Sequence, residues 1–285
     1  ETIYYVYVTR HNKLVGVVSL RDLIVAPLQT TLKDIMHDNI VYVLADTDQE
    51  EVAHLLSKYD FIAVPVIDSQ QKILGLVTID DVVDVLSAET TEDISKIGGS
   101  IPLDAPYLDT SVWSMFRKRI GWLMVLFIAQ ALTSTILKSH SHILQTAVSL
   151  TFFIPLLMDT GGNAGSQAAT LVIRGMAVGE VRYEHVLKVL FKELCVGLGL
   201  GLVMGAVTLL RARMMGESSV VGLTVSLTIL SIIIVAVLTG SLLPIGLKKV
   251  GVDPAVVSGP LVTTLVDTSG LLIYFAIAAK LMGII

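Results

Sequence analysis

The sequence predicts a chain in two parts: an α+β soluble part, followed by an all-α polytopic membrane part with five transmembrane helices. Hydrophobic residues make up 53% of the 285 residues and charged residues only 16%, with a mean hydropathy of +0.76. A soluble domain of this size is rarely so apolar. The charged residues also gather before residue 120, and the sequence beyond it is nearly continuous apolar sequence.

The soluble part contains an internal repeat. Tyr4–Ile24 and Ile62–Val83 both read as a strand, a polar turn, an apolar strand with one glycine, and the acidic start of a helix. Gly16 and Gly75 occupy equivalent positions. A repeat of this size and pattern resembles a pair of CBS domains. We therefore expect a partial first CBS unit over 1–29 and a second unit over 30–88.

CBS pairs often bind adenosine nucleotides, so the resemblance implies a site for ATP. Its ribose contacts would fall on Thr78 and Asp81, with Ser19 and Asp22 equivalent in the partial unit. A hydroxyl followed by a carboxylate at a strand-to-helix turn can hold a ribose. Because the same residue types are ordinary helix N-caps, both interpretations stay open.

The membrane part is predicted from apolar runs long enough to cross a hydrocarbon core of about 30 Å. The five expected spans are Ile120–Leu137, Leu144–Ile173, Leu194–Leu210, Val220–Leu247 and Ala255–Ile285.

Basic residues orient these spans, because they are enriched in cytoplasmic loops. We expect a multi-pass protein of the inner or plasma membrane, in contact with lipid, with its N-terminal region cytoplasmic and its C-terminus outside. The outer end carries Lys138, Arg211, Arg213 and Lys280, and the inner end carries Arg117, Lys118, Arg119, Arg174, Arg182, Lys188, Lys192, Lys248 and Lys249.

Only the second and fifth spans carry acids at depth. The second has Asp159, and the fifth has Asp253 at its entry and Asp267 near its middle. An ionised aspartate at the bilayer centre costs about 2.5–3.5 kcal/mol, so such residues usually face a bundle interior or a water-filled path. We expect Pro260 to interrupt the fifth helix and free a backbone carbonyl. Alternatively, the polar residues of the second span, Asn163, Ser166 and Gln167, only join helices.

Acids along a membrane path indicate a cation as the solute. The two acidic spans contain no Cys or His, and oxygen ligands favour Mg²⁺, Ca²⁺ or Mn²⁺. A sparse site around one aspartate suits Mg²⁺, which keeps most of its water when bound. The sequence contains no phosphate-binding loop or pump phosphorylation motif. None is needed, because the membrane potential supplies about 2.3 kcal/mol per charge per 100 mV.

The chain resembles the MgtE family of magnesium channels and transporters. The resemblance is carried by "PLLMDTGGNAGSQ" at 155–167 and "GVDPAVVSGPLVTTLVDTSG" at 251–270. It implies a homodimer with a pore on the two-fold axis, between the second and fifth spans of both copies. It also implies a cytoplasmic Mg²⁺ contact at Asp253 and a connecting "plug" helix over about Leu103–Arg119. The pore metal site would comprise Asp267, Asn163, Thr263 and Asp159.

An acidic cluster precedes the first span. A solvated helix face is the usual interpretation of such a run. Between a sensor domain and a pore mouth, however, it predicts a Mg²⁺-sensing surface that closes the pore when cytoplasmic Mg²⁺ rises. We expect an acidic linker and connecting helix over 89–119 and the pore domain over 120–285. The cluster consists of Asp80, Asp81, Asp84, Glu89, Glu92 and Asp93.

The expected function is thus passive, Mg²⁺-selective uptake, with Mg²⁺ as ligand and no nucleic-acid partner. A secondary transporter coupling Mg²⁺ to Na⁺ or H⁺ is the alternative. An enzyme is not expected. Asp159-Thr160-Gly161 matches the Asp-Thr-Gly of aspartic proteases, but Asp267-Thr268-Ser269 lacks the glycine of a second motif.

Overall fold

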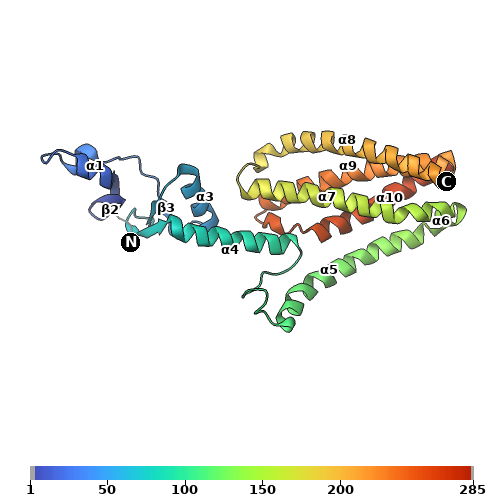
Figure 1. The fold of residues 1–285 in the computed structure, drawn as a ribbon, viewed down its shortest axis with the longest axis horizontal. Helices are drawn as coiled ribbons and strands as arrows, with labels where there is room; N and C mark the ends of the chain where they lie inside the picture. Colours follow the sequence, from blue (N-terminus) through green and yellow to red (C-terminus); the bar gives the residue numbers. More distant parts are fainter. Residues whose placement is uncertain (1–3, 284–285) are drawn as a thin grey trace. The chain divides into compact units, whose positions relative to one another are not determined.

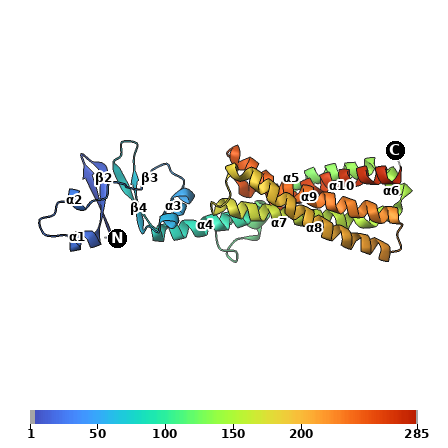
Figure 2. The same ribbon diagram turned by 90° about the horizontal axis from the view of Figure 1, so that it is seen from above.

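The computed structural model describes residues 4–283 of the chain. The chain divides into two compact units, Glu1–Thr91 and Glu92–Ile285. Figure 1 and Figure 2 show their elements from two directions. Helix α4 (Ile79–Ile97) begins in the first unit and ends in the second.

The first unit is α+β, as predicted. Strands β1 (Tyr5–Arg10) and β2 (Lys13–Ser19) form an antiparallel hairpin, followed by the short helices α1 (Leu20–Val25) and α2 (Leu32–Ile35). A three-stranded sheet of order β3-β4-β5 follows, with β3 parallel to β4 and β4 antiparallel to β5. Its elements are β3 (Val43–Leu44), α3 (Gln49–Tyr59), β4 (Ala63–Ile67) and β5 (Ile73–Thr78). Both copies of the expected strand, turn, strand and helix are confirmed.

The core of this unit lies between α3 and the three-stranded sheet. Val52, Ala53 and Leu56 share one face of α3 because they are three or four residues apart or adjacent, and all three are buried. They pack in one cluster with Val64 of β4 and Val82 of α4. The second repeat therefore has a small apolar core of its own.

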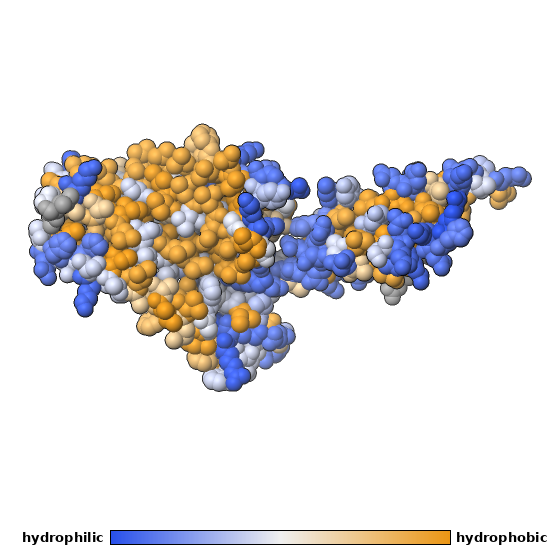
Figure 3. All heavy atoms as spheres, turned by 180° about the vertical axis from the view of Figure 1, so that it is seen from behind, coloured by the Kyte–Doolittle hydropathy of each residue, from blue (hydrophilic) through white to orange (hydrophobic). Residues whose placement is uncertain are grey.

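The second unit is all helical. Figure 1 shows its long helices running alternately between two ends of the unit, with the C-terminus at the end opposite the start of α5. Figure 3 shows a broad apolar surface on one face of this unit, with hydrophilic residues towards its ends. The elements are α5 (Val112–Ser139), α6 (Ser141–Thr146), η1 (Val148–Phe153), α7 (Ile154–Ala177), η2 (Tyr183–His185), α8 (Val186–Met214), α9 (Ser219–Lys249), η3 (Pro254–Val256) and α10 (Gly259–Met282).

Four segments of the described chain are long and apolar enough to cross a membrane: Val112–Ser139, Tyr183–Met214, Ser219–Lys249 and Gly259–Met282. Helix α7 is not among them, so the expected count of five spans is not confirmed. The expected second span, Leu144–Ile173, is divided among α6, η1 and α7. Although α7 is 24 residues long, its polar residues and glycines lower its hydropathy.

Glycines allow the helices to approach closely. Helix α9 packs against α7, α8 and α10. A Cβ added to Gly240 of α9 would lie 2.1 Å from the carbonyl oxygen of Gly165 on α7, and one added to Gly197 of α8 would lie 2.7 Å from Val237. Small residues at these crossings bring the backbones together, as they commonly do in membrane helix bundles.

Two expectations about helix ends are wrong. Pro260 does not interrupt a helix, because it lies in the first turn of α10 behind the N-cap Ser258, where a missing N–H breaks no helical hydrogen bond. The connecting helix expected over Leu103–Arg119 begins only at Val112. The segment before it is irregular, because its glycines and prolines oppose helix formation.

Candidate ion site between α5, α7 and α10

Helix α7 separates its polar residues from its glycines. Asp159, Asn163 and Ser166 are spaced by four and three residues and therefore share one face. Gly161, Gly162 and Gly165 are buried on another. A Cβ at Gly161 would lie 2.4 Å from Ile232, and one at Gly162 would lie 2.8 Å from Thr263. The glycines thus bring α7 against α9 and α10, while the polar face remains available to water or an ion.

Asp267 lies in a shallow, open cavity of about 620 Å³ between α5, α7 and α10. Ser258 caps the start of α10, and Thr263 and Asp267 are one turn apart on that helix. Hydroxyl groups and one amide supply the other polar lining. The lining residues are Leu123, Leu126, Phe127, Gln130, Ser166, Gly259, Pro260, Thr263, Thr264 and Asp267.

The two carboxylate oxygens of Asp267 have different surroundings. Nε2 of Gln130 donates a hydrogen bond to Oδ2 over 3.3 Å. Oδ1 is buried and has no hydrogen-bond partner among the described residues. A buried acceptor without a partner destabilises the folded protein. Binding of a cation or of its water at this oxygen would therefore be the most favourable.

The other predicted pore residues divide into two groups. Thr263 lines the cavity beside Asp267, and its Oγ1 lies 3.5 Å from the hydroxyl of Ser166. Asn163 and Asp159 do not line it. They are exposed on α7, where Nδ2 of Asn163 donates to Oδ2 of Asp159 over 3.2 Å. One copy of the chain therefore brings two of the four residues together.

Several acidic residues of α4 have protein partners, and they do not form a ready metal site. Within residues 4–283, no three or more Asp, Glu, His or Cys side chains lie close enough to hold a metal ion together. Glu89 accepts a hydrogen bond from Nε2 of Gln49 over 2.5 Å, and Glu92 pairs with Lys96. The six acids of the expected cluster thus lie along one helix without converging on a point, and Asp253, the seventh residue of the expected sensing set, precedes η3.

The predicted nucleotide residues act as helix caps in this structure. Thr78 Oγ1 donates to Oδ2 of Asp81 over 2.8 Å at the start of α4. Ser19 Oγ donates to Oδ2 of Asp22 over 2.6 Å at the start of α1. A nucleotide would have to engage these groups in addition to, or in place of, their capping contacts.

Asp253, the predicted cytoplasmic contact, is paired with a lysine. Nζ of Lys96 at the end of α4 lies 2.6 Å from Oδ2 of Asp253, and Lys96 also bonds Glu92. Partial burial lowers the pKa of the Lys96 ammonium, but the hydrogen bonds to Asp253 and Glu92 outweigh this effect and raise it overall. The lysine is therefore charged at neutral pH and joins α4 to the segment that enters α10.

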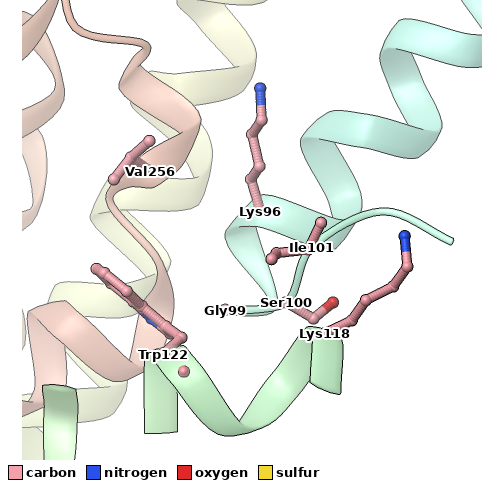
Figure 4. Close-up of a pocket in the computed structure, with 8 residues that line it drawn as sticks. Lys96, Gly99, Ser100, Ile101, Lys118, Trp122 and Val256 are labelled. Atoms are coloured by element: carbon pink, nitrogen blue, oxygen red, sulfur yellow. The ribbon is translucent and has the colours of Figure 1, made fainter. Parts of the chain in front are cut away.

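A pocket of about 330 Å³ lies beside this ion pair. Figure 4 shows Trp122 rising from α5 towards the segment that carries Val256, with Gly99 beside the indole. Nε1 of Trp122 donates to Oγ of Ser258, the cap of α10, over 3.0 Å. The end of α4, the start of α5 and the start of α10 are thus linked by polar contacts at one end of the helical unit.

The sequence did not identify Gln130 as a residue of the site, and it did not reveal that Lys96 pairs with Asp253. A glutamine inside an apolar span is itself unusual and could have marked Gln130 as a polar contact. Its partner lies 137 residues away in the sequence, so periodicity could not identify it. Lys96 was visible as the basic residue within an acidic run, but its bond to Asp253 depends on tertiary structure.

Comparisons with known proteins agree with both halves of this description. Residues 154–277 match the MgtE family model, described as a divalent cation transporter, and residues 32–88 match the CBS domain. Magnesium transporter MgtE of Thermus thermophilus is 43% identical over 99% of this chain and 63% of its own length. That of Enterococcus faecalis is 37% identical over 99% of this chain and 62% of its own length.

Solved structures were also matched. A crystal structure of the cytosolic domain of the Mg²⁺ channel MgtE in complex with ATP shares 55% identity with this chain. The matched region comprises 30% of this chain and 35% of the chain in that crystal structure, with a TM-score of 0.29. A crystal structure of the soluble part of a magnesium transporter shares 51% identity, over 31% and 35% of the two chains, with a TM-score of 0.31.

The fold and the matches define a multi-pass membrane protein in which a CBS region precedes a domain that matches a divalent cation transporter model. Residues 154–277 form a domain that matches the MgtE family, and 99% of the chain aligns with part of each of these two MgtE relatives. The chain spans about 63% of the length of the Thermus thermophilus relative. The matched family model and the relatives are described as transporters rather than enzymes, which argues against the aspartic-protease alternative.

Proposed function

We propose that this chain forms the ion path of a Mg²⁺-selective channel that takes up magnesium down its electrochemical gradient. The observation that supports this most is Asp267, a carboxylate in an apolar helix with one buried oxygen lacking a partner among the described residues. Oxygen-lined, sparse sites suit a hydrated Mg²⁺. The curated relatives are named as magnesium transporters.

In this proposal α7 also crosses the membrane. It is the second span in chain order and brings the total to five. It packs against α9 and α10, and its polar face would line the path instead of meeting lipid. The soluble region would be cytoplasmic and the C-terminus outside, in an inner or plasma membrane. The pore domain would occupy 120–285 and the CBS units 1–29 and 30–88.

The proposed assembly is a homodimer with its pore on the two-fold axis. The path would then be lined by α7 and α10 of both copies, so that Asn163 and Asp159 would join Asp267 and Thr263. Gating would come from cytoplasmic Mg²⁺ bound by the acids of α4 and by Asp253, with the segment over 89–119 connecting sensor and pore. ATP at Thr78 and Asp81 remains a prediction from the CBS resemblance.

The pore assignment is tested by Asp267→Asn in the full chain reconstituted in liposomes. We expect Mg²⁺ flux to fall at least about tenfold, the factor given by 1.4 kcal/mol of lost ion binding. Ser269→Ala is the matched control, because this hydroxyl bonds only backbone of its own helix and lies two residues away. A well-folded Asp267→Asn protein with native flux would exclude Asp267 from the path.

The same preparation separates a channel from the coupled alternative. A channel carries current that reverses at the Mg²⁺ equilibrium potential, with no requirement for a second ion. Coupled exchange requires a Na⁺ or H⁺ gradient and shifts the reversal potential with it.

A further inference from the structure

Gln130 is a polar side chain within an apolar helix, and it contacts the acid at the candidate ion site. It lies in the middle of α5, with Phe127 and Leu126 one turn before it on the same side of the cavity. Its Nε2 donates to Oδ2 of Asp267 over 3.3 Å. One turn further along, the hydroxyls of Thr133 and Thr268 lie 2.9 Å apart. Two polar contacts therefore join α5 to α10 at the level of this acid.

The Gln130 contact makes the carboxylate asymmetric. Oδ2 is occupied by the amide, whereas Oδ1 is buried without a partner among the described residues. The nearby polar lining groups, Ser166 and Thr263, are neutral hydroxyls. The site therefore offers a cation one oxygen without a hydrogen bond and a second whose acceptor capacity is already partly used.

This asymmetry matters because divalent cations use carboxylates differently. Ca²⁺ accepts six to eight oxygens in flexible geometry and readily takes both oxygens of one carboxylate. Mg²⁺ requires near-octahedral geometry, releases water reluctantly and uses few protein oxygens. A carboxylate with one oxygen already bonded is suited to a hydrated Mg²⁺ and poorly suited to chelating Ca²⁺.

We propose that Gln130 is a positioning and specificity-determining residue, which holds one oxygen of Asp267 and so favours hydrated Mg²⁺ over Ca²⁺ in the path. The inference rests on the proposed function, in which Asp267 contacts the transported ion. It adds that discrimination depends on a neutral donor from α5, in addition to the acid on α10.

The test measures selectivity, which a purely structural role of Gln130 would not change. Full-chain protein in liposomes is assayed for Mg²⁺ flux with increasing Ca²⁺, using Gln130→Met to remove the donor at similar length. We expect Ca²⁺ to half-inhibit Mg²⁺ flux at a concentration at least about fivefold lower than in the native protein, in line with a lost hydrogen bond to a charged group. Gln130→Glu, which adds a second carboxylate, should shift the value in the same direction and serves if Gln130→Met does not fold.

Thr133→Val is the matched control. It removes the neighbouring contact between α5 and α10 but leaves the amide on Asp267, so its Ca²⁺ inhibition should equal that of the native protein. Native Ca²⁺ inhibition in both Gln130 variants would overturn the inference, and so would an equal shift in Thr133→Val. If Asp267→Asn retains native flux, the proposed function itself fails. If Asp267→Asn abolishes flux while the Gln130 variants keep native selectivity, only this inference fails.

Discussion

At the scale of single residues, the glycines of the helical unit have a packing role that is distinct from that of the neighbouring polar residues. Gly161, Gly162 and Gly165 face α9 and α10, and their positions leave no space for a side chain. Asp159 and Asn163 lie on another face of α7 and are exposed. The glycine-rich, polar character of this helix thus has two separate causes: close approach on one side and a hydrophilic face on the other.

Gly240 provides the clearest test of this packing. Its added Cβ would lie 2.1 Å from the carbonyl oxygen of Gly165, so Gly240→Ala should force α7 and α9 apart. We expect a loss of about 1–3 kcal/mol in stability, the usual range for overpacking, measured as earlier thermal unfolding in detergent. Gly246→Ala on the same helix is the control, because nothing lies within 4 Å of its added Cβ. Equal unfolding temperatures for the two variants would contradict the packing role.

At the scale of elements, the sequence predicted the secondary structure that depends on local residue patterns. The strand, turn, strand and helix of each CBS repeat follow from alternating apolar residues between turns, and these local signals survive in the structure. The polar and acidic residues that mark α7 and α10 were also evident. Contacts such as that between Gln130 and Asp267 could not be predicted, because they join residues that are distant in the sequence.

The wrong interpretation of Pro260 shows a related limit of sequence-based prediction. Pro260 in an apolar run was interpreted as a break in a helix, although Ser258 two residues earlier is a good N-cap and proline is favoured in the first helical turn. The apolar run that contains α10 already begins in the loop before that helix, so hydropathy alone does not reveal where the helix begins. Capping residues carry that information more directly than the apolar pattern does.

Helix α4 carries the acids on which the proposed gating depends. Neutralising Asp84, Glu89, Glu92 and Asp93 to Asn and Gln should leave conduction intact and weaken closure by cytoplasmic Mg²⁺. The physical reason is that Mg²⁺ bridging carboxylates replaces repulsion between them with attraction. We expect the inhibitory Mg²⁺ concentration to rise several-fold, measured as open probability in excised patches while internal Mg²⁺ is increased.

The control removes the same amount of negative charge elsewhere on the first unit, through Asn and Gln at Asp46, Glu50, Glu51 and Asp60. These residues lie outside α4, with Asp46, Glu51 and Asp60 exposed and Glu50 half-buried, so a general charge effect would appear in both proteins. An unchanged inhibition curve in the α4 variant, or an equal change in the control, would identify the acids of α4 as an ordinary solvated face.

At the scale of the whole molecule, one copy of the chain offers an incomplete ion path. Its cavity is lined by α5, α7 and α10 and holds Asp267 and Thr263, while Asn163 and Asp159 face outward. A second copy related by a two-fold axis would bring the exposed polar face of α7 towards its equivalent. Cyclic dimers are also the commonest symmetric assembly. Completion of the path therefore favours a pore between two copies over a pore within one.

Cross-linking tests this arrangement directly. Cys195, the single cysteine of the sequence, is exposed on α8 and is first replaced by serine. In that background we expect Asn163→Cys to form dimers in membranes with a short bifunctional maleimide, because the polar faces of the two α7 helices would line one narrow path. Leu272→Cys is the control. It is exposed on α10 but lies five residues from Asp267, about 140° around the helix, and should remain largely monomeric under the same treatment. Efficient cross-linking at Leu272 with none at Asn163 would place the dimer contact on another face and would contradict a pore on the axis between α7 and α10.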